Sequence, residues 1–404
     1  MTVNSNISNN VLTANQAMIA GVFDRTSGTA TGDYANAITQ LTTLSPGQLS
    51  GALNQLSGDL YPSLSTIERQ TTTAQMQLLS NRLANLTGPG MPGVSAVSQK
   101  NGIRFVSSQS SGTPSATAAT GSTNSDGQTW TSWAQGYGLG GSIAGDGSAG
   151  GTNYRLGGTL FGVERWLGEN LMVGVLGGYA GTSVSDRQNG STAQINAYQA
   201  GLYELYREDL LYLSNIDAFS NDSFNVTRPI SFGTIQKTAT GNSDGNQWAH
   251  YTEAGTTFNF DELRLQPFLG VQYMYLDQRG YSETGAGSLD MTTSHQIVNS
   301  VRNGFGARLY QETTWGNTLV IPSLSARYQH EWGNGTQLIS SSFSGAPTAQ
   351  FATNGNHTGR DFGLFTLGGT AYVTERFSIY ANVDTQVAAS FFALIGSGGI
   401  QYSW

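Results

Sequence analysis

Residues 263–275 read LRLQPFLGVQYMY, and the odd and even positions of this stretch carry different kinds of side chain. The odd positions are apolar or aromatic, whereas the even positions are polar or glycine except for Phe268 and Met274. An alternation with a period of two is typical of a β-strand that turns one face to an apolar environment. The stretch is longer than the usual strand of about 5 or 6 residues and suits the roughly 9 to 11 residues of a strand that spans a membrane.

The same alternation recurs through residues 129–404, for example at residues 171–179 and 377–387. Short polar connections follow at 167–170, 207–209, 259–262, 313–318 and 374–376, and they alternate with Gly-, Ser- and Asn-rich stretches, predicted as long loops, near 140–152, 183–191, 220–245, 277–297 and 333–359. Short turns at one end and long loops at the other are typical of outer-membrane β-barrels. The pattern predicts an all-β fold, an antiparallel barrel of about 12 strands with both ends on the periplasmic, short-turn side.

A soluble β-sandwich or a lipocalin-like barrel is the competing interpretation, because its strands alternate too. The apolar faces of such sheets pack inward against one another. Here the second face consists of Gly, Ser, Gln and Asn with occasional charges, which favours a membrane barrel around a hydrated lumen. The same parity predicts five lumen-facing charges, which we interpret as hydrated or bracing groups: Glu164, Glu253, Arg264, Arg308 and Asp384.

The composition excludes several other classes of protein. Charged residues make up 11% of the chain, against about 25% in soluble domains. No run of 18 apolar residues marks a membrane helix, a net charge of -8 offers no basic surface for nucleic acid, and the absence of cysteine excludes disulfides and thiolate metal sites. Residues 1–10 lack the basic and apolar regions of a signal peptide, so we expect an exported product to have further sequence upstream.

Enzyme and cofactor motifs match only weakly. Residues 241–245 fit G-x-S-x-G, but they fall in a predicted loop with no helix behind them. Residues 136–141 and 145–150 fit G-x-G-x-x-G without opening a helix, and no two histidines are spaced i, i+4. The sequence therefore predicts no catalytic, cofactor or metal site. A barrel hydrolase that uses Ser243 or His330 stays as a distant alternative.

Residues 1–86 have helical spacing instead. Ser45 and Pro46 suit the start of a helix, and Pro62 predicts a kink or a new helix after Asp59. As a helix, residues 62–86 would span about 37 Å, more than the roughly 30 Å of the hydrocarbon core, which suits a pore helix inside the barrel.

A small helical cap in the periplasm or on the cell surface is the alternative, because a stripe of leucines needs an apolar partner and a polar lumen is not one. Residues 87–128 are rich in Gly, Ser, Thr, Ala and Pro, which predicts a linker between the helices and the barrel.

The chain ends in SGGIQYSW, residues 397–404, with aromatic and apolar side chains on one face of a final strand. A polar residue, a glycine and a terminal aromatic at this spacing resemble the C-terminal signal by which outer-membrane barrels are recognised for assembly. The residues that carry the resemblance are Ser397, Gly399, Ile400, Tyr402 and Trp404.

More of the chain resembles the classical, type V, bacterial autotransporters. The matching segments are, in order, WAQGYG at 133–138 with DG at 146–147, GTLFGVE at 158–164, GGY at 177–179, GLY at 201–203, EAG at 253–255 and GYSETG at 280–285, preceded by ALNQLSGDLY at 52–61. The resemblance covers nearly the whole chain and implies the C-terminal translocator of such a protein. The repeated passenger of this family is absent, and Asn81 and Asn85 stand singly, so self-cleavage at an asparagine pair is not supported.

The resemblance implies a function in the outer membrane of a Gram-negative bacterium. The barrel would anchor the chain and help to export its N-terminal passenger segment to the cell surface, without a cofactor. Its expected partners are outer-membrane lipid, the barrel-assembly machinery and its own N-terminal segment. A diffusion channel of the porin kind is the alternative, and whether the helix fills the pore distinguishes the two.

Overall fold

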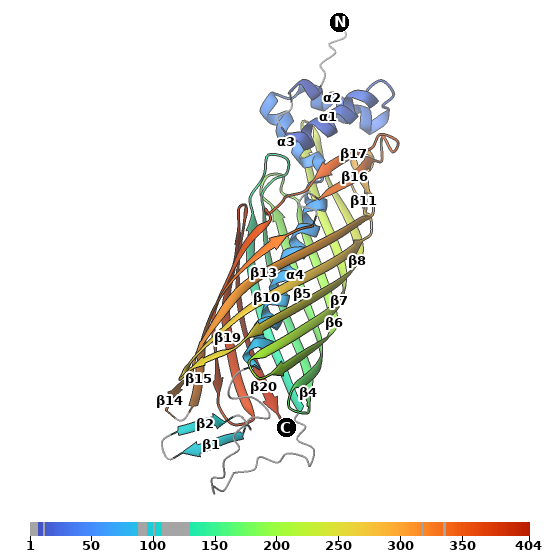
Figure 1. Ribbon diagram of the computed structural model, residues 1–404. Coiled ribbons are helices and arrows are strands. Elements are labelled where there is room, and N and C mark those ends of the chain that lie inside the picture. Colours follow the sequence, from blue (N-terminus) through green and yellow to red (C-terminus); the bar gives the residue numbers. More distant parts are fainter. Residues whose placement is uncertain are drawn as a thin grey trace.

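The computed structural model describes residues 7–10, 13–87, 95–99, 102–106, 130–316, 318–333 and 337–404. In these residues 12 long antiparallel strands close into a barrel, with helices at its N-terminal end (Figure 1). The long strands are β3 (Trp130–Ile143), β4 (Thr152–Leu167), β5 (Leu171–Asp186), β6 (Thr192–Glu208), β7 (Leu211–Phe232), β8 (Ile235–Thr256), β10 (Leu263–Gln278), β13 (Gln296–Gln311), β15 (Thr318–Glu331), β18 (Asp361–Tyr372), β19 (Phe377–Ala388) and β20 (Phe391–Ser403). The predicted fold class is confirmed.

The remaining elements are short. Inside the barrel sheet they are β9 (Phe258–Phe260), β11 (Ser282–Thr284), β12 (Met291–Thr293), β14 (Thr313–Trp315), β16 (Leu338–Phe343) and β17 (Phe351–Asn354). Two 3-10 turns, η1 (Ile7–Asn10) and η2 (Gly287–Leu289), and a separate hairpin of β1 (Ser95–Gln99) and β2 (Gly102–Val106) complete the set. The hairpin lies within the predicted linker, most of which falls outside the described residues.

The last strand closes the barrel on the first. Along β20 and β3, Ile400 pairs with Ala134, and the backbones of Trp130 and Trp404 exchange hydrogen bonds of 3.1 and 2.9 Å. Every long strand therefore has a neighbour on both sides, so no strand edge is left for lipid to meet.

The parity predicted for residues 263–275 is correct. Leu269 is 66% exposed and Val271 is 49% exposed on the outside of β10, while Gln266 and Gln272 are buried inside. The backbone hydrogen bonds are satisfied between neighbouring strands. The outer face of β10 presents mainly apolar side chains to the membrane.

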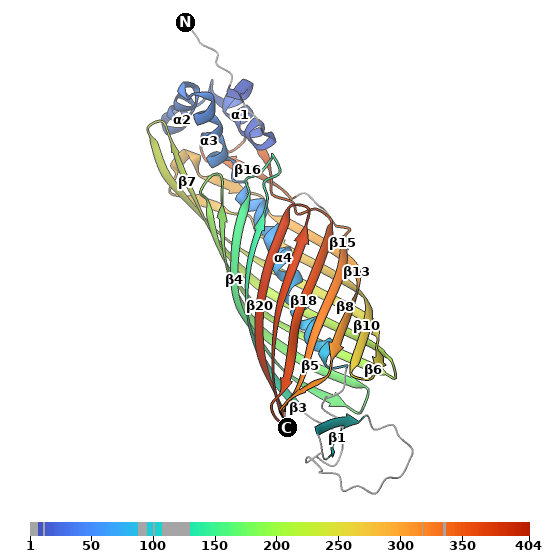
Figure 2. The same cartoon turned by 90° about the vertical axis from the view of Figure 1, so that its left-hand side faces the viewer.

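The prediction of a long loop at residues 220–245 is wrong. β7 and β8 continue through it as a hairpin that turns at Gly233, whose φ is +54°. This hairpin rises beyond the other strands to the helices (Figure 2). Its outer face is in water and rich in Asn, Ser and Thr, which hid the apolar inward positions Phe224, Val226 and Ile230. Parts of the predicted loops 277–297 and 333–359 likewise form short strands.

In its described residues the N-terminal part forms four α-helices: α1 (Ala14–Thr26), α2 (Gly32–Thr43), α3 (Pro46–Ser57) and α4 (Leu60–Asn85). Ser45 caps α3 in a capping box with Gln48, and Gly58 ends it with a left-handed φ of +61°. A new helix then begins two residues before Pro62, as the sequence predicted. In the described part of the chain, no helix has the length and apolar character needed to cross a membrane.

Helices α1, α2 and α3 form a cap over the end of the barrel that carries the long connections, and α4 runs down inside the barrel (Figure 1). The two arrangements weighed for the helical segment therefore occur together. The cap is fastened by apolar packing: Phe23 stacks on Phe343, which stacks on Phe351, and Ile230 and Phe232 at the tip of β7 belong to the same buried cluster.

We expect Val271→Arg to destabilise the barrel by about 2 to 4 kcal/mol, because a guanidinium would replace an apolar side chain facing the middle of the bilayer. Asn153→Arg is the control, since Asn153 is exposed and faces outward at the loop end of β4, where the cost is about 0 to 1 kcal/mol. Denaturant unfolding in lipid vesicles measures both. Equal losses of stability would contradict the outward placement.

Gln272→Arg places the same charge at the neighbouring, inward-facing position, and it is not a harmless control. The lumen at Gln272 is filled rather than hydrated: its side chain donates to Thr73 of α4 at 3.1 Å, and across the strands it pairs with Arg302. A second cation there would be buried beside the first, so Gln272→Arg is expected to be costly as well.

Candidate functional site in the barrel lumen

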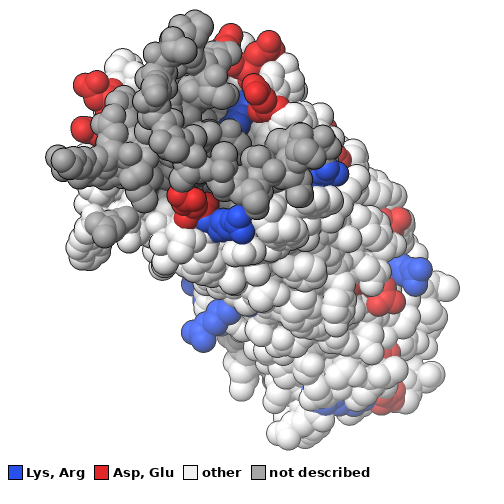
Figure 3. Space-filling model, turned by 90° about the horizontal axis from the view of Figure 1, so that it is seen from below, with Lys and Arg blue, Asp and Glu red and all other residues white. Residues whose placement is uncertain are grey.

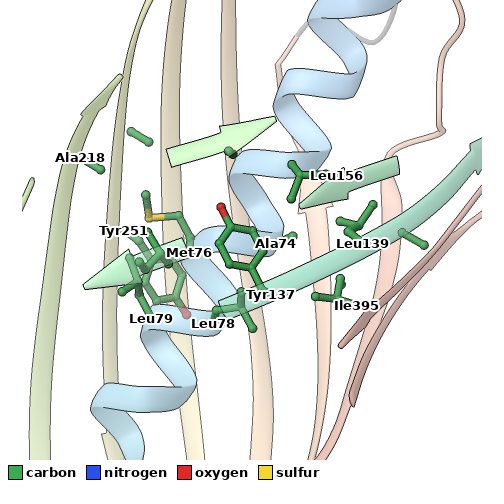
Figure 4. Close-up of a cluster of buried hydrophobic side chains, with 14 of the residues drawn as sticks. Ala74, Met76, Leu78, Leu79, Tyr137, Leu139, Leu156, Ala218, Tyr251 and Ile395 are labelled. Atoms are coloured by element: carbon green, nitrogen blue, oxygen red, sulfur yellow. The ribbon is translucent and has the colours of Figure 1, made fainter. Parts of the chain in front are cut away.

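Helix α4 fills the lumen. All its residues from Leu60 to Ala84 are buried, although the helix is polar over most of its surface. Figure 4 shows Met76 and Leu79 against Tyr251, and Leu78 beside Tyr137 of the barrel wall. The wall supplies apolar and aromatic side chains among its polar ones, so the leucines of the helix have apolar partners inside the barrel.

The lower part of the helix is held by a buried ion pair. Arg82 donates to both oxygens of Glu164 on β4, at 2.7 and 2.8 Å. Its guanidinium lies 4.5 Å from the centre of the Trp133 ring, and the Tyr203 hydroxyl donates to Glu164 at 2.8 Å. This bidentate ion pair fixes the rotation of α4 about its own axis and its position along the barrel axis.

A second cluster is centred on Glu253 of β8. Its carboxylate accepts from Arg308 at 2.7 and 3.0 Å and from Arg327 at 3.0 Å. The hydroxyls of Tyr212 and Tyr251 donate to it at 2.7 and 2.6 Å. Ser80 of α4 donates to the same carboxylate at 2.9 Å, so the cluster joins four strands, β7, β8, β13 and β15, to the helix.

Further up, Arg302 of β13 pairs with Glu331 at 2.8 Å and donates to Thr73 and Gln70 of α4 at 2.9 and 3.3 Å. On β19, three strands further around the barrel, Asp384 accepts from Gln77 and Asn81 of the helix. The helix is thus bonded to the wall along most of its length.

All five charges predicted to face the lumen are buried there. Glu164, Glu253, Arg308 and Asp384 contact α4, whereas Arg264 lies over the ring of Tyr310 at 4.1 Å.

Four charged residues of these clusters were not predicted from the sequence: Arg82, Arg302, Arg327 and Glu331. Arg302 has the parity of Arg308 on the same strand, so the alternation could have found it.

At the cap, a further buried ion pair lies where α3 meets α4. Arg228 near the tip of β7 binds Glu283 at 2.9 Å and donates to the carbonyl of Gln55 at 3.0 Å. Tyr61 donates to the same Glu283 carboxylate. The helical segment is therefore bonded to the barrel at its upper end and along the lumen.

The residues of the enzyme alternative lie apart from one another. Ser243 stands in strand β8, not in a loop, and its hydroxyl donates to the carbonyl of Arg279 at 2.6 Å. His330 contacts Asp361 on the outside of β15. Among the described residues, no group of three acidic or histidine side chains is placed to hold a metal ion.

The residues of the predicted assembly signal lie on β20, except Trp404, which directly follows it. Ile400, Tyr402 and Trp404 are exposed, whereas Ser397 and Gly399 have the parity of the inward-facing positions. Figure 3 shows the outer wall from the end where the C-terminus lies, with only scattered charged side chains on it.

Comparison with known proteins relates the chain to one family. The family model described as the autotransporter beta-domain matches residues 132–384. The chain is 24% identical to outer membrane protein A of Rickettsia rickettsii over 60% of its own length and 11% of that protein, and 25% identical to the esterase EstA of Pseudomonas aeruginosa over 52% of its length and 32% of that protein. It thus spans less than a third of these relatives.

Two solved structures share the fold. The translocator domain of autotransporter NalP from Neisseria meningitidis superimposes with a TM-score of 0.57 at 15% identity, covering 82% of this chain and 97% of that one. The beta domain of the Bordetella autotransporter BrkA gives 0.52 at 17% identity, covering 68% and 99%.

Proposed function

The chain belongs to the autotransporter β-domain family and lies in the outer membrane, and from this premise we propose that its barrel anchors the chain there and carries its own N-terminal segment to the cell surface. The observation that supports this proposal is the path of α4 through the lumen. The helix joins a cap at the long-loop end to the chain that enters β3 at the short-turn end.

The work of this barrel is physical rather than catalytic in our proposal. Ion pairs and hydrogen bonds from Arg82, Ser80 and Thr73 hold the helix in place once the cap has passed. The cap then packs on Phe343 and Ile230 of the barrel, which favours the exported position over return. A diffusion channel is disfavoured because α4 occupies the lumen.

Labelling of single cysteines tests the direction of export. We expect Ser27→Cys in the cap and Ser344→Cys beside β16 to react on intact cells with a membrane-impermeant maleimide, and Glu169→Cys in the turn after β4 to stay unlabelled. All three positions are exposed, and the chain has no cysteine of its own to give background. Labelling at Ser344→Cys with protection at Ser27→Cys would contradict export while leaving the barrel intact.

The barrel-assembly machinery is a proposed partner through the C-terminal strand. We expect Trp404→Lys to leave most of the protein uninserted, because a charge would stand on the outer face that ends the last strand. Heat-modifiable migration and surface exposure measure insertion. Trp315→Lys, an even more exposed tryptophan at an internal position, is the control and should insert normally. Normal insertion of both variants would contradict the proposed signal.

A further inference from the structure

A hydrogen-bonded network of polar side chains interrupts the lipid-facing surface of β6, β7 and β8. On β7, Leu213 and Phe219 are exposed to lipid, and between them on the same face stand Asn215 and Asp217. Their neighbours in the strand, Ser214 and Ile216 among them, are buried inward. Polar and charged groups on the lipid side of a barrel wall are destabilising unless something pairs with them.

The polar side chains are linked by hydrogen bonds. Asn215 donates to Glu204 at 2.6 Å, and Thr252 donates to Asn215 at 2.6 Å. The two ring nitrogens of His250 lie 2.8 Å from the Thr252 hydroxyl and 2.9 Å from Asp217.

The two carboxylates of this network have different partners. Asp217 is bonded to the ring of His250. Glu204 is bonded only to the neutral amide of Asn215, so its charge is left without a counter-ion among the described residues.

A groove of about 660 Å³ opens beside this network on the outer wall. Its apolar lining includes Val173, Val175 and Leu202, and Glu204 lines it as well. Arg165 of β4 also lines the groove.

Arg165 makes no ion pair with any residue that the structure describes. Its guanidinium lies 5.2 Å from the centre of the Trp130 ring, and its Nε is buried without a hydrogen-bond partner. One apolar groove thus presents an unpaired cation and an unpaired anion.

The groove is at the short-turn end of the wall, which is the periplasmic end in outer-membrane barrels. Trp130, which begins β3, and Leu167, which ends β4, both line it. This is the end of the barrel where Trp130 is bonded to Trp404, opposite the cap. The groove therefore faces the periplasmic leaflet of the membrane.

We propose that this groove binds a phospholipid with a phosphoethanolamine headgroup, with its phosphate at Arg165, its ammonium at Glu204 and its acyl chains along Leu202 and Val175. A zwitterion neutralises both charges, whereas an anionic headgroup without an amine leaves Glu204 unpaired. Charge-assisted hydrogen bonds are stronger than hydrogen bonds between neutral groups. The groove should therefore select this headgroup over others. This inference concerns lipid outside the wall and does not depend on export through the lumen.

Native mass spectrometry of the full chain in detergent tests the proposal. The chain is mixed with phosphatidylethanolamine, phosphatidylcholine or phosphatidylglycerol of identical acyl chains. We expect preferential retention of phosphatidylethanolamine, because the methylated amine of phosphatidylcholine has no proton to donate and phosphatidylglycerol has no amine. Equal retention of the three lipids would overturn the proposal.

Two neutral variants separate the two ends of the headgroup. Glu204→Gln should retain phosphatidylethanolamine and phosphatidylglycerol equally, and Arg165→Gln should retain both about tenfold less. Both replacements remove a lipid-facing charge, and unchanged heat-modifiable migration verifies that the barrel forms. Arg155→Gln on the same strand and Glu169→Gln in the turn are matched controls, which should behave like the unchanged chain.

A preference for phosphatidylethanolamine that survives in Glu204→Gln would overturn the assignment of the ammonium. A dimer of the unchanged chain that disappears in Arg165→Gln, with no difference in bound lipid, would assign the groove to a second copy of the chain and overturn the proposal as a whole.

Discussion

Deletion of residues 1–87 is expected to turn a closed barrel into an open channel. The deletion removes α4, and a helix with its side chains has a diameter of about 10 to 12 Å, so an opening of that order should remain. All of α4 from Leu60 to Ala84 is buried in the lumen, and no other described helix enters it. Planar-bilayer recordings should show large, steady conductance for the deleted chain and almost none for the full chain.

A shorter deletion distinguishes the helix in the lumen from the cap above it. Removing residues 1–44 takes away α1 and α2 but keeps α3 and α4 with the contacts of Arg82 and Ser80. This variant should stay closed. Equal conductance of the full chain and the chain lacking residues 1–87 would mean that α4 does not seal the pore, and would favour the diffusion channel.

The second large effect is expected at Glu253. Glu253→Gln should destabilise the barrel by about 3 to 5 kcal/mol, because Arg308 and Arg327 would stay buried after losing the carboxylate between them. The bonds from Tyr212 and Tyr251 lose their ionic acceptor at the same time. Denaturant unfolding in vesicles measures the loss.

Two comparisons make this result specific. Glu262→Gln removes an exposed carboxylate in the turn before β10 and should change stability by less than about 0.5 kcal/mol. Adding Arg308→Met to Glu253→Gln should recover part of the loss, since one of the two unpaired cations is then gone. A Glu253→Gln barrel as stable as the Glu262→Gln barrel would show that the cluster is not a structural brace.

The helix should also loosen in Glu253→Gln, because Ser80 of α4 donates to this carboxylate. Brief openings in bilayer recordings, absent from the Glu262→Gln control, are the expected sign. The two readouts are separate, since stability reports the bonds between strands and conductance reports the bond to the helix.

The sequence by itself determined the facing of the strands, the barrel and the break between the two last helices. Successive side chains of a strand point to opposite sides, so Val271 and Gln272 were assigned to opposite faces without any knowledge of neighbours. Gly58 and Pro62 likewise act on their own backbone, which is why the helix boundary was predictable.

Only the tertiary structure decided what each inward side chain meets. The alternation put Glu253 inside the barrel, but its partners Ser80 and Arg327 are 173 and 74 residues away along the chain. The closure and register of 12 strands bring them together, and no local pattern carries that information. The wrong prediction of a loop at 220–245 has the same origin. An Asn- and Ser-rich strand in water is recognisable only once the cap that covers its inner face is in place.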